Sequence, residues 1–307
     1  MRRSPPVHPL AFAALLASNV ALAFGPWFVR LADVGPVASA FWRIALAAPV
    51  LAALALASGW RPRGIGRGTG PMTGLGLGIA VFFAGICFAA DLGSWHLGIL
   101  RTTLANATLF GNSATIIYPV YGFLIARAWP SQMQAVALLL AGAGGALLMG
   151  RSYQLDSRHL AGDLLCLAAG ILYTGYFVLM ARAREILPPL PALALSTLAS
   201  LLPLLVFAVV LGEQLWPDRW WPLVALALAS QVVGQGLMIF ALGQLPPVVV
   251  GIALLIQPVV AATIGWIAYA ERPGVADLAG ALLVAAALVL VRQARRDALA
   301  PDTPADA

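Results

Sequence analysis

Apolar stretches of roughly 20 residues recur along the whole chain, separated by short polar or Pro/Gly segments. A helix of about this length crosses a bilayer core, and it bonds all of its backbone amides internally. The sequence therefore predicts an all-α integral membrane fold of ten helices. The predicted spans are 10–30, 36–58, 72–95, 103–126, 132–150, 160–183, 190–212, 220–243, 247–270 and 275–292.

The composition excludes an ordinary soluble domain. Of 307 residues, 61% are hydrophobic and only 10% are charged, whereas soluble domains carry about 25% charged residues. All the basic residues are arginines near the ends of apolar stretches, a pattern typical of membrane orientation rather than nucleic-acid binding. Cys87 and Cys166 lie inside apolar runs, which argues against a disulfide or a metal site. We expect no cofactor and no metal.

The distribution of arginine predicts that both termini are cytoplasmic. With the N-terminus inside, the cytoplasmic arginines outnumber the others, as the positive-inside rule requires. They are Arg2, Arg3, Arg61, Arg63, Arg67, Arg127, Arg182, Arg184, Arg292, Arg295 and Arg296.

A weak internal repeat relates residues 97–149 to residues 242–291, at an offset of about 144 residues. Both segments follow one pattern of tight turn, apolar helix, short loop and small-residue helix, and Gly98 matches Gly243. Five helices in each half would place the halves in opposite orientations, the inverted repeat of many transporters. The predicted units are a first repeat at 1–151, an inverted second repeat at 152–295 and a polar tail at 296–307.

Four short motifs carry a resemblance to a known family. They are Ala40-Phe41-Trp42-Arg43, Gly162-Asp163-Leu164-Leu165, Gln257-Pro258-Val259 and Ala270-Glu271-Arg272-Pro273. With the repeat, they make the chain resemble the drug/metabolite transporter superfamily, EamA type, over nearly its whole length. The Glu-Arg turn is intact only in the second half, since the first half has Ala128-Trp129 there. The aromatic-rich, lysine-free chain is most similar to the bacterial aromatic amino-acid exporters, the YddG-like branch.

The resemblance implies a non-enzymatic transporter in a bacterial inner membrane. It implies alternating access, with amino acids bearing aromatic or other apolar side chains as substrates, and an exporter or facilitative uniporter as the mode. Exchange of phosphorylated sugars or nucleotide sugars, or drug antiport, is the alternative. The expected partners are the small-molecule substrate and membrane lipids, with no nucleic acid, and the expected state is a monomer or weak homodimer.

Polar side chains within the spans are the candidate pathway residues, because lipid makes them costly unless they face a cavity or another helix. The fourth span carries Asn106, Asn112, Thr115 and Tyr118. These residues predict either a wet stripe along the pathway or hydrogen bonds between helices, and the pattern does not separate the two.

Two further pairs share helix faces: Tyr173 with Tyr176, and Gln231 with Gln235. Both pairs suit an amphiphilic solute, because they offer aromatic faces and hydrogen-bonding groups. Gln257 is also a candidate, although it precedes Pro258, and its amide is predicted to satisfy the backbone carbonyl that the proline leaves unbonded.

Arg43 lies two turns into the second span and is the best candidate to bind a substrate carboxylate. Snorkelling or pairing within the protein is the competing interpretation. Asp91, in the outer third of the third span, and His96, about one turn beyond it, are the candidates for proton coupling. A proton-coupled carrier normally buries a carboxylate or a histidine near the midplane of the membrane, whereas Asp91 is predicted nearer the surface. The sequence therefore favours facilitated diffusion over proton antiport.

Other function classes have weaker support. An intramembrane enzyme needs catalytic groups at depth, yet His8, His96 and His159 are dispersed and the predicted loops are short. A channel needs a charged ring or a re-entrant segment, and neither is evident. Phosphorylated substrates need several buried cations, and only Arg43 is predicted to be deep.

Overall fold

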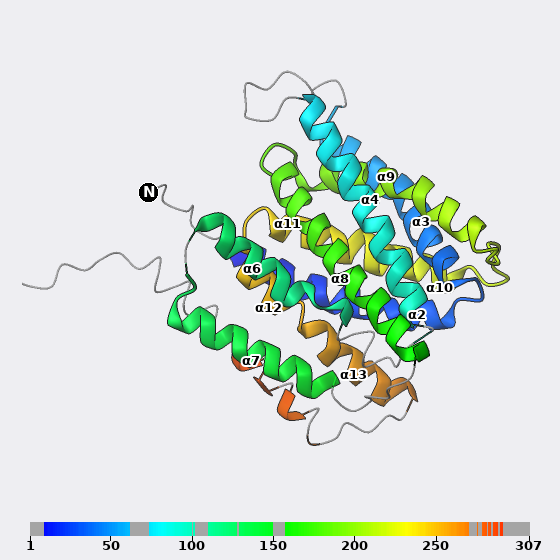
Figure 1. The fold of residues 1–307 in the computed structure, drawn as a ribbon. Helices are drawn as coiled ribbons and strands as arrows, with labels where there is room; N and C mark the ends of the chain where they lie inside the picture. Colours follow the sequence, from blue (N-terminus) through cyan, green and yellow to red (C-terminus); the bar gives the residue numbers. More distant parts are fainter. Residues whose placement is uncertain are drawn as a thin grey trace, which may run out of the picture.

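The computed structural model describes residues 9–61, 74–99, 101, 110–127, 129–149 and 157–269, with short pieces of 275–290. Within these residues all regular structure is helical, and no strand occurs (Figure 1). The all-α prediction is therefore confirmed for the described part of the chain. Asn106, the motif at 270–273 and the predicted tail lie outside it.

The first half of the chain forms helices that match the predicted spans closely. They are α1 (Pro9–Ala23), α2 (Gly25–Leu31), α3 (Pro36–Ala57), α4 (Gly74–Ile99), α6 (Ala114–Ala126) and α7 (Gln132–Met149). The third span was placed too early, at 72–95, because α4 continues through the polar residues around His96 to Ile99.

The second half begins with two long helices and continues with shorter ones. They are α8 (Ser157–Ala183), α9 (Pro189–Val210), α10 (Trp221–Leu226), the π-helix η2 (Ala227–Gln235), α11 (Gly236–Leu242), α12 (Pro247–Ala253) and α13 (Ile256–Tyr269). The eighth predicted span thus contains a π-helical segment, which hydrophobic periodicity alone does not predict.

Six helical segments among the described residues are long and apolar enough to cross a membrane. They are Leu10–Leu31, Pro36–Ala57, Gly76–Ile99, Leu160–Ala183, Pro189–Val210 and Trp221–Leu242. Shorter apolar helices include Ala114–Ala126 and Gln132–Gly144. The protein is therefore a multi-pass membrane protein.

Small residues allow the central helices to approach closely, as is common in membranes. α4 lies alongside α8 (Figure 1) and also packs on α9. At the second contact, a Cβ added to Gly85 would clash with the Cβ of Ala199 and would lie 2.9 Å from the carbonyl oxygen of Ser196. Ser200 Oγ donates to the carbonyl of Gly85 over 2.9 Å. Glycine at position 85 therefore sets the spacing of α4 and α9.

Two helices, one from each half, are interrupted at similar places. A turn at 112–113 precedes α6, and a turn at 254–255 separates α12 from α13. α6 and α12 pack together and run antiparallel, because Gly251 approaches Pro119 while Gly122 approaches Pro247. Pro119 lies inside a continuous α6, so the break falls upstream of this proline.

Replacing Gly85 by Ala should destabilise the protein by about 1–3 kcal/mol, because the new methyl group overpacks the α4–α9 contact. The apparent melting temperature of the purified protein in detergent should fall. Gly78→Ala is the matched control on the same helix, because a Cβ there meets nothing within 4 Å. Equal melting temperatures for the two variants would contradict this account of the contact.

Candidate functional site

A cavity of about 110 Å³ lies between helices of both halves, which is room for several water molecules. Its walls come from α1, α2, α3, α4, the turn before α6, α8, η2 and α13. The polar lining residues are Arg43, Asp91, Asn112, Tyr173, Gln235 and Gln257. All six were predicted as candidate residues, and the fold brings them to one place.

Arg43 is buried in the interior of the helix bundle. Only 5% of the residue is exposed. Its Nε donates to Gln231 Oε1 over 3.2 Å, and its guanidinium carbon lies 5.8 Å from the centre of the Phe88 ring. Of the two structural interpretations, pairing within the protein is the one observed.

Asp91 shares the cavity with Arg43. Asp91 is 9% exposed. Its carboxylate is therefore more deeply buried than its place near the end of the span suggested. His96 is also buried, but it is held elsewhere, with Nδ1 2.8 Å from the carbonyl oxygen of Pro36 and 3.2 Å from Ser39 Oγ. The two predicted coupling residues therefore lie in different surroundings.

The π-helix η2 directs two glutamines to different partners. Gln231 Nε2 donates to Thr197 Oγ1 over 3.1 Å, while Gln235 Nε2 donates to the Tyr173 hydroxyl over 3.2 Å. Gln235 Oε1 is buried and has no hydrogen-bond partner within the described part of the chain. A buried acceptor without a partner is rare, and this one belongs to a residue that lines the cavity.

The side chain of Gln257 binds another side chain, and it is the backbone N–H of Gln257 that donates to the Leu254 carbonyl, one turn before Pro258, over 3.1 Å. Gln257 Nε2 donates to Asn19 Oδ1 over 3.0 Å, and Asn19 Nδ2 donates to the carbonyl of Leu15 over 2.8 Å. The predicted bond of the Gln257 side chain to the backbone is therefore wrong. The amide pair instead joins α1 to α13 at the cavity wall.

The predicted polar stripe on the fourth span is divided by the turn at 112–113. Asn112 lines the cavity, whereas Thr115 is buried on α6 and its Oγ1 has no partner among the described residues. Tyr118 packs edge-on against Phe177, with 5.4 Å between the ring centres. One regular helix had been assumed for this span, and the turn instead separates Asn112 from Thr115 and Tyr118 on α6.

Aromatic rings fill the bundle beside the cavity, toward the turn between α8 and α9. Phe88 stacks on Tyr176 at 4.6 Å, and Tyr173 lies 4.2 Å from Phe177 between ring centres. Tyr176 and Phe177 are fully buried. The predicted candidates Tyr118 and Tyr176 thus belong to this aromatic cluster, while Tyr173 belongs to both the cluster and the cavity.

Several residues at the site were not predicted. Phe88 and Trp95 line the cavity, and Asn19 and Thr197 bond to side chains that were predicted. Asn19 and Thr197 were detectable as polar residues inside apolar spans. Phe88 and Trp95 were not, since aromatic residues are common throughout such helices.

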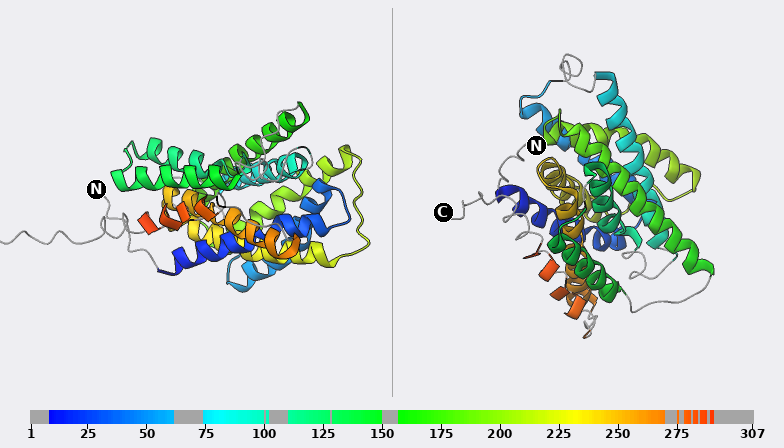
Figure 2. Two further views of the ribbon diagram at one scale, coloured as in Figure 1. Left: turned by 90° about the horizontal axis from the view of Figure 1, so that it is seen from below. Right: turned by 60° about the vertical axis from the view of Figure 1, so that its left-hand side comes forward.

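At one end of the bundle, the connection between α9 and α10 is bound to the corner between α2 and α3 (Figure 2). The backbone N–H of Gly35 donates to the carbonyl of Gln214 over 3.0 Å, and Trp42 Nε1 donates to the carbonyl of Leu215 over 2.6 Å. The Ala38 N–H donates to Glu213 Oε2 over 2.8 Å. Partial burial raises the pKa of Glu213, and backbone N–H groups oppose the shift.

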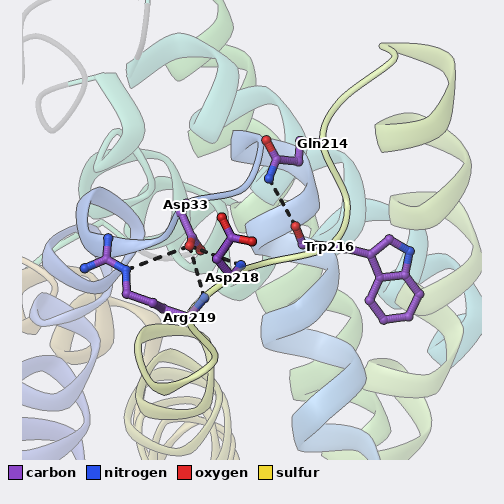
Figure 3. Close-up of polar contacts among 5 residues, drawn as sticks. All are labelled: Asp33, Gln214, Trp216, Asp218 and Arg219. Carbon is purple, nitrogen blue, oxygen red and sulfur yellow. Dashed lines mark hydrogen bonds and ion pairs between the residues drawn. The ribbon is translucent and has the colours of Figure 1, made fainter.

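Asp33 completes this contact (Figure 3). Its Oδ2 accepts the backbone N–H groups of Asp218 and Arg219 over 3.1 and 3.0 Å. The side chain of Arg219 approaches the same oxygen at 3.8 Å. Backbone bonds, more than the ion pair, therefore hold this loop of the second half against the first.

The sequence from 160 to 293 matches the EamA-like transporter family. The expected family resemblance is confirmed, and the EamA-like match is consistent with the drug/metabolite transporter superfamily. EamA-like proteins form a family of transporters, so the match over residues 160–293 implies a transporter of this general type.

A crystal structure titled "Crystal structure of protein" shares the fold. Its TM-score is 0.78 over 94% of this chain and 99% of that chain, at 15% sequence identity. The likeness at that identity concerns the fold alone. A search of curated proteins gives no match to this EamA-like chain.

Replacing Asp33 by Ala should lower the free energy of unfolding by about 1–2 kcal/mol, because two backbone N–H groups lose a charged acceptor. Arg219→Ala should cost no more than about 1 kcal/mol, because its side chain is 65% exposed and water screens the ion pair. Thermal unfolding of the two variants in detergent tests this order. A larger loss for Arg219→Ala would show that the ion pair dominates.

Proposed function

We propose that this EamA-like protein carries amino acids with aromatic or other apolar side chains across a bacterial inner membrane. The mechanism is alternating access, and the mode is export or facilitated uniport. The observation that supports it is the shared cavity of Arg43 and Asp91, which provides one cation and one carboxylate. A zwitterion matches that pair of charges, whereas a net anion does not.

The carboxylate of the substrate binds Arg43, because a guanidinium offers a planar fork of donors. Gln231 already occupies Nε, which leaves the terminal nitrogens for the substrate. The ammonium of the substrate needs acceptors, and Asp91 and the free Oε1 of Gln235 supply them. Both ends of an amino acid thus find partners in one cavity.

The side chain of the substrate meets an apolar wall. Phe88, Trp95, Leu22 and Leu92 line the cavity together with the polar groups. Aromatic faces bind apolar and aromatic side chains by offset or edge-to-face contact. The wall therefore favours large apolar amino acids over small polar ones.

Alternating access requires two halves that move against each other, and we propose ten spans in two inverted five-helix repeats, with both termini cytoplasmic. The antiparallel α6 and α12, each next to a helix break, support this arrangement. Interrupted helices at corresponding positions of two halves typify transporter sites. Asn112 lies at one break, and Gln257 follows the other closely. Release on the other side requires the aromatic cluster to separate.

Transport of phosphorylated or nucleotide sugars is the alternative within the superfamily. Such anions need more than one buried cation, and Arg43 is the one arginine among the described cavity residues. Proton coupling through Asp91 or His96 remains a second mode for the proposed carrier. A pH gradient distinguishes it from facilitated diffusion.

Counterflow in proteoliposomes tests the proposed function. Vesicles loaded with unlabelled phenylalanine should accumulate external labelled phenylalanine, and vesicles loaded with a sugar phosphate should not. The measurement is made with and without a pH gradient, which should have little effect on a uniporter. If vesicles loaded with the sugar phosphate show counterflow and vesicles loaded with phenylalanine do not, the proposal is rejected in favour of the alternative.

Replacing Gln235 or Asn112 by Leu should reduce the initial rate of counterflow at least about fivefold, because each change removes hydrogen-bonding groups from the cavity. Both variants should still elute as monodisperse protein. Thr263→Val is the control, since it removes a polar group at an exposed position of α13 where the hydroxyl bonds only its own helix. Unchanged rates in both cavity variants would exclude a role for these side chains in transport.

A further inference from the structure

We propose that Thr197 and Gln231 are positioning residues that hold the Arg43 guanidinium for the carboxylate of the substrate. The inference rests on the proposed function, because it assumes that a carboxylate binds there. It adds two residues of the second half to a site whose cation comes from the first. Thr197 lies on α9 and Gln231 on η2, while Arg43 lies on α3.

The three side chains form a hydrogen-bond chain with only one possible direction. Arginine has donors alone, so the Gln231 oxygen must face Arg43 Nε, as it does at 3.2 Å. The Gln231 nitrogen then points away and needs an acceptor, which Thr197 Oγ1 provides at 3.1 Å. Thr197 and Gln231 are fully buried, so water does not easily replace either bond.

This chain fixes which edge of the guanidinium is available. A guanidinium binds a carboxylate with two donors along one edge, and Nε belongs to one of the two edges it can use. Because Gln231 occupies Nε, the edge formed by the two terminal nitrogens remains for the substrate. The Phe88 ring, 5.8 Å from the guanidinium carbon, further limits how the group can tilt.

The contact differs from hydrogen bonds that only hold the helices together. Ser200, one turn along α9 from Thr197, donates to backbone carbonyls of α4 and α9 and bonds no cavity residue. Thr197 instead accepts a hydrogen bond from the side-chain amide of Gln231, and the oxygen of that amide accepts one from Arg43 in the cavity. Removing the Thr197 hydroxyl should therefore change carboxylate binding, because the Gln231 amide loses the acceptor that orients it.

The test compares Thr197→Val, which keeps the shape and removes the hydroxyl, with Thr197→Ser, which keeps the hydroxyl. Concentration-dependent counterflow of labelled phenylalanine is measured in proteoliposomes for wild type and both variants. Thr197→Val should raise the half-saturation constant about fivefold, the effect of losing roughly one hydrogen bond. Its maximal rate should stay within about twofold, and Thr197→Ser should match wild type. Inhibition by phenylalaninamide, which lacks the carboxylate, should be the same for all three.

Three results would overturn the positioning role while leaving transport established. They are equal half-saturation constants for wild type and Thr197→Val, a Ser variant as impaired as the Val variant, or a loss of maximal rate alone. If Thr197→Val is not recovered as folded protein, Gln231→Glu replaces it. Its carboxylate would compete for the guanidinium and raise the half-saturation constant, and an unchanged constant would likewise overturn the role. Wild-type protein without amino-acid counterflow would overturn the proposed function itself.

Discussion

The burial of one guanidinium constrains the rest of this structure. A charge in a membrane interior is costly unless polar groups surround it, and Arg43 is 95% withdrawn from solvent, with 5% exposed. Two other helices supply the groups around it: Gln231 of η2 accepts a hydrogen bond from it, and the Phe88 ring and Asp91 of α4 line the same cavity. The helices that supply these groups are the ones that enclose the cavity. The side chains that stabilise the buried charge of Arg43 are therefore the same ones that form the site.

Interruptions in regular helix place polar groups around that charge. The turn at 112–113 and the turn at 254–255 lie next to Asn112 and Gln257, and the π-helix carries Gln231 and Gln235. Irregular backbone is tolerated in a membrane where it is buried in protein or lines a cavity. In this protein the three irregular segments lie around the same cavity. The long regular helices α4, α8 and α9 supply the scaffold between them.

The sequence predicted an all-helical, multi-pass membrane protein and six polar residues of the cavity lining. Long apolar stretches determine the spans because lipid demands them, and polar residues within spans are few enough that Arg43, Asp91 and Gln235 stood out. Periodicity could not show where a helix breaks, so Tyr118 was placed on the same stripe as Asn112. Periodicity also could not show which side chains, far apart in the sequence, form hydrogen bonds with each other. Thr197 and Asn19 acquire their roles only when α9 and α1 meet η2 and α13.

The π-helix has a consequence for how this segment tolerates change. Its i→i+5 bonding makes it one residue longer than the α-helical path it replaces. Deleting a single residue from Ala227–Gln235 would therefore restore an α-helix and leave the helix that follows in about its present orientation. Met238 and Ile239, now fully buried, would keep their neighbours, whereas a deletion within α11 would rotate the residues after it by about 100°. The segment can thus lose one residue without disturbing the packing beyond it, although Gln231 and Gln235 would change position.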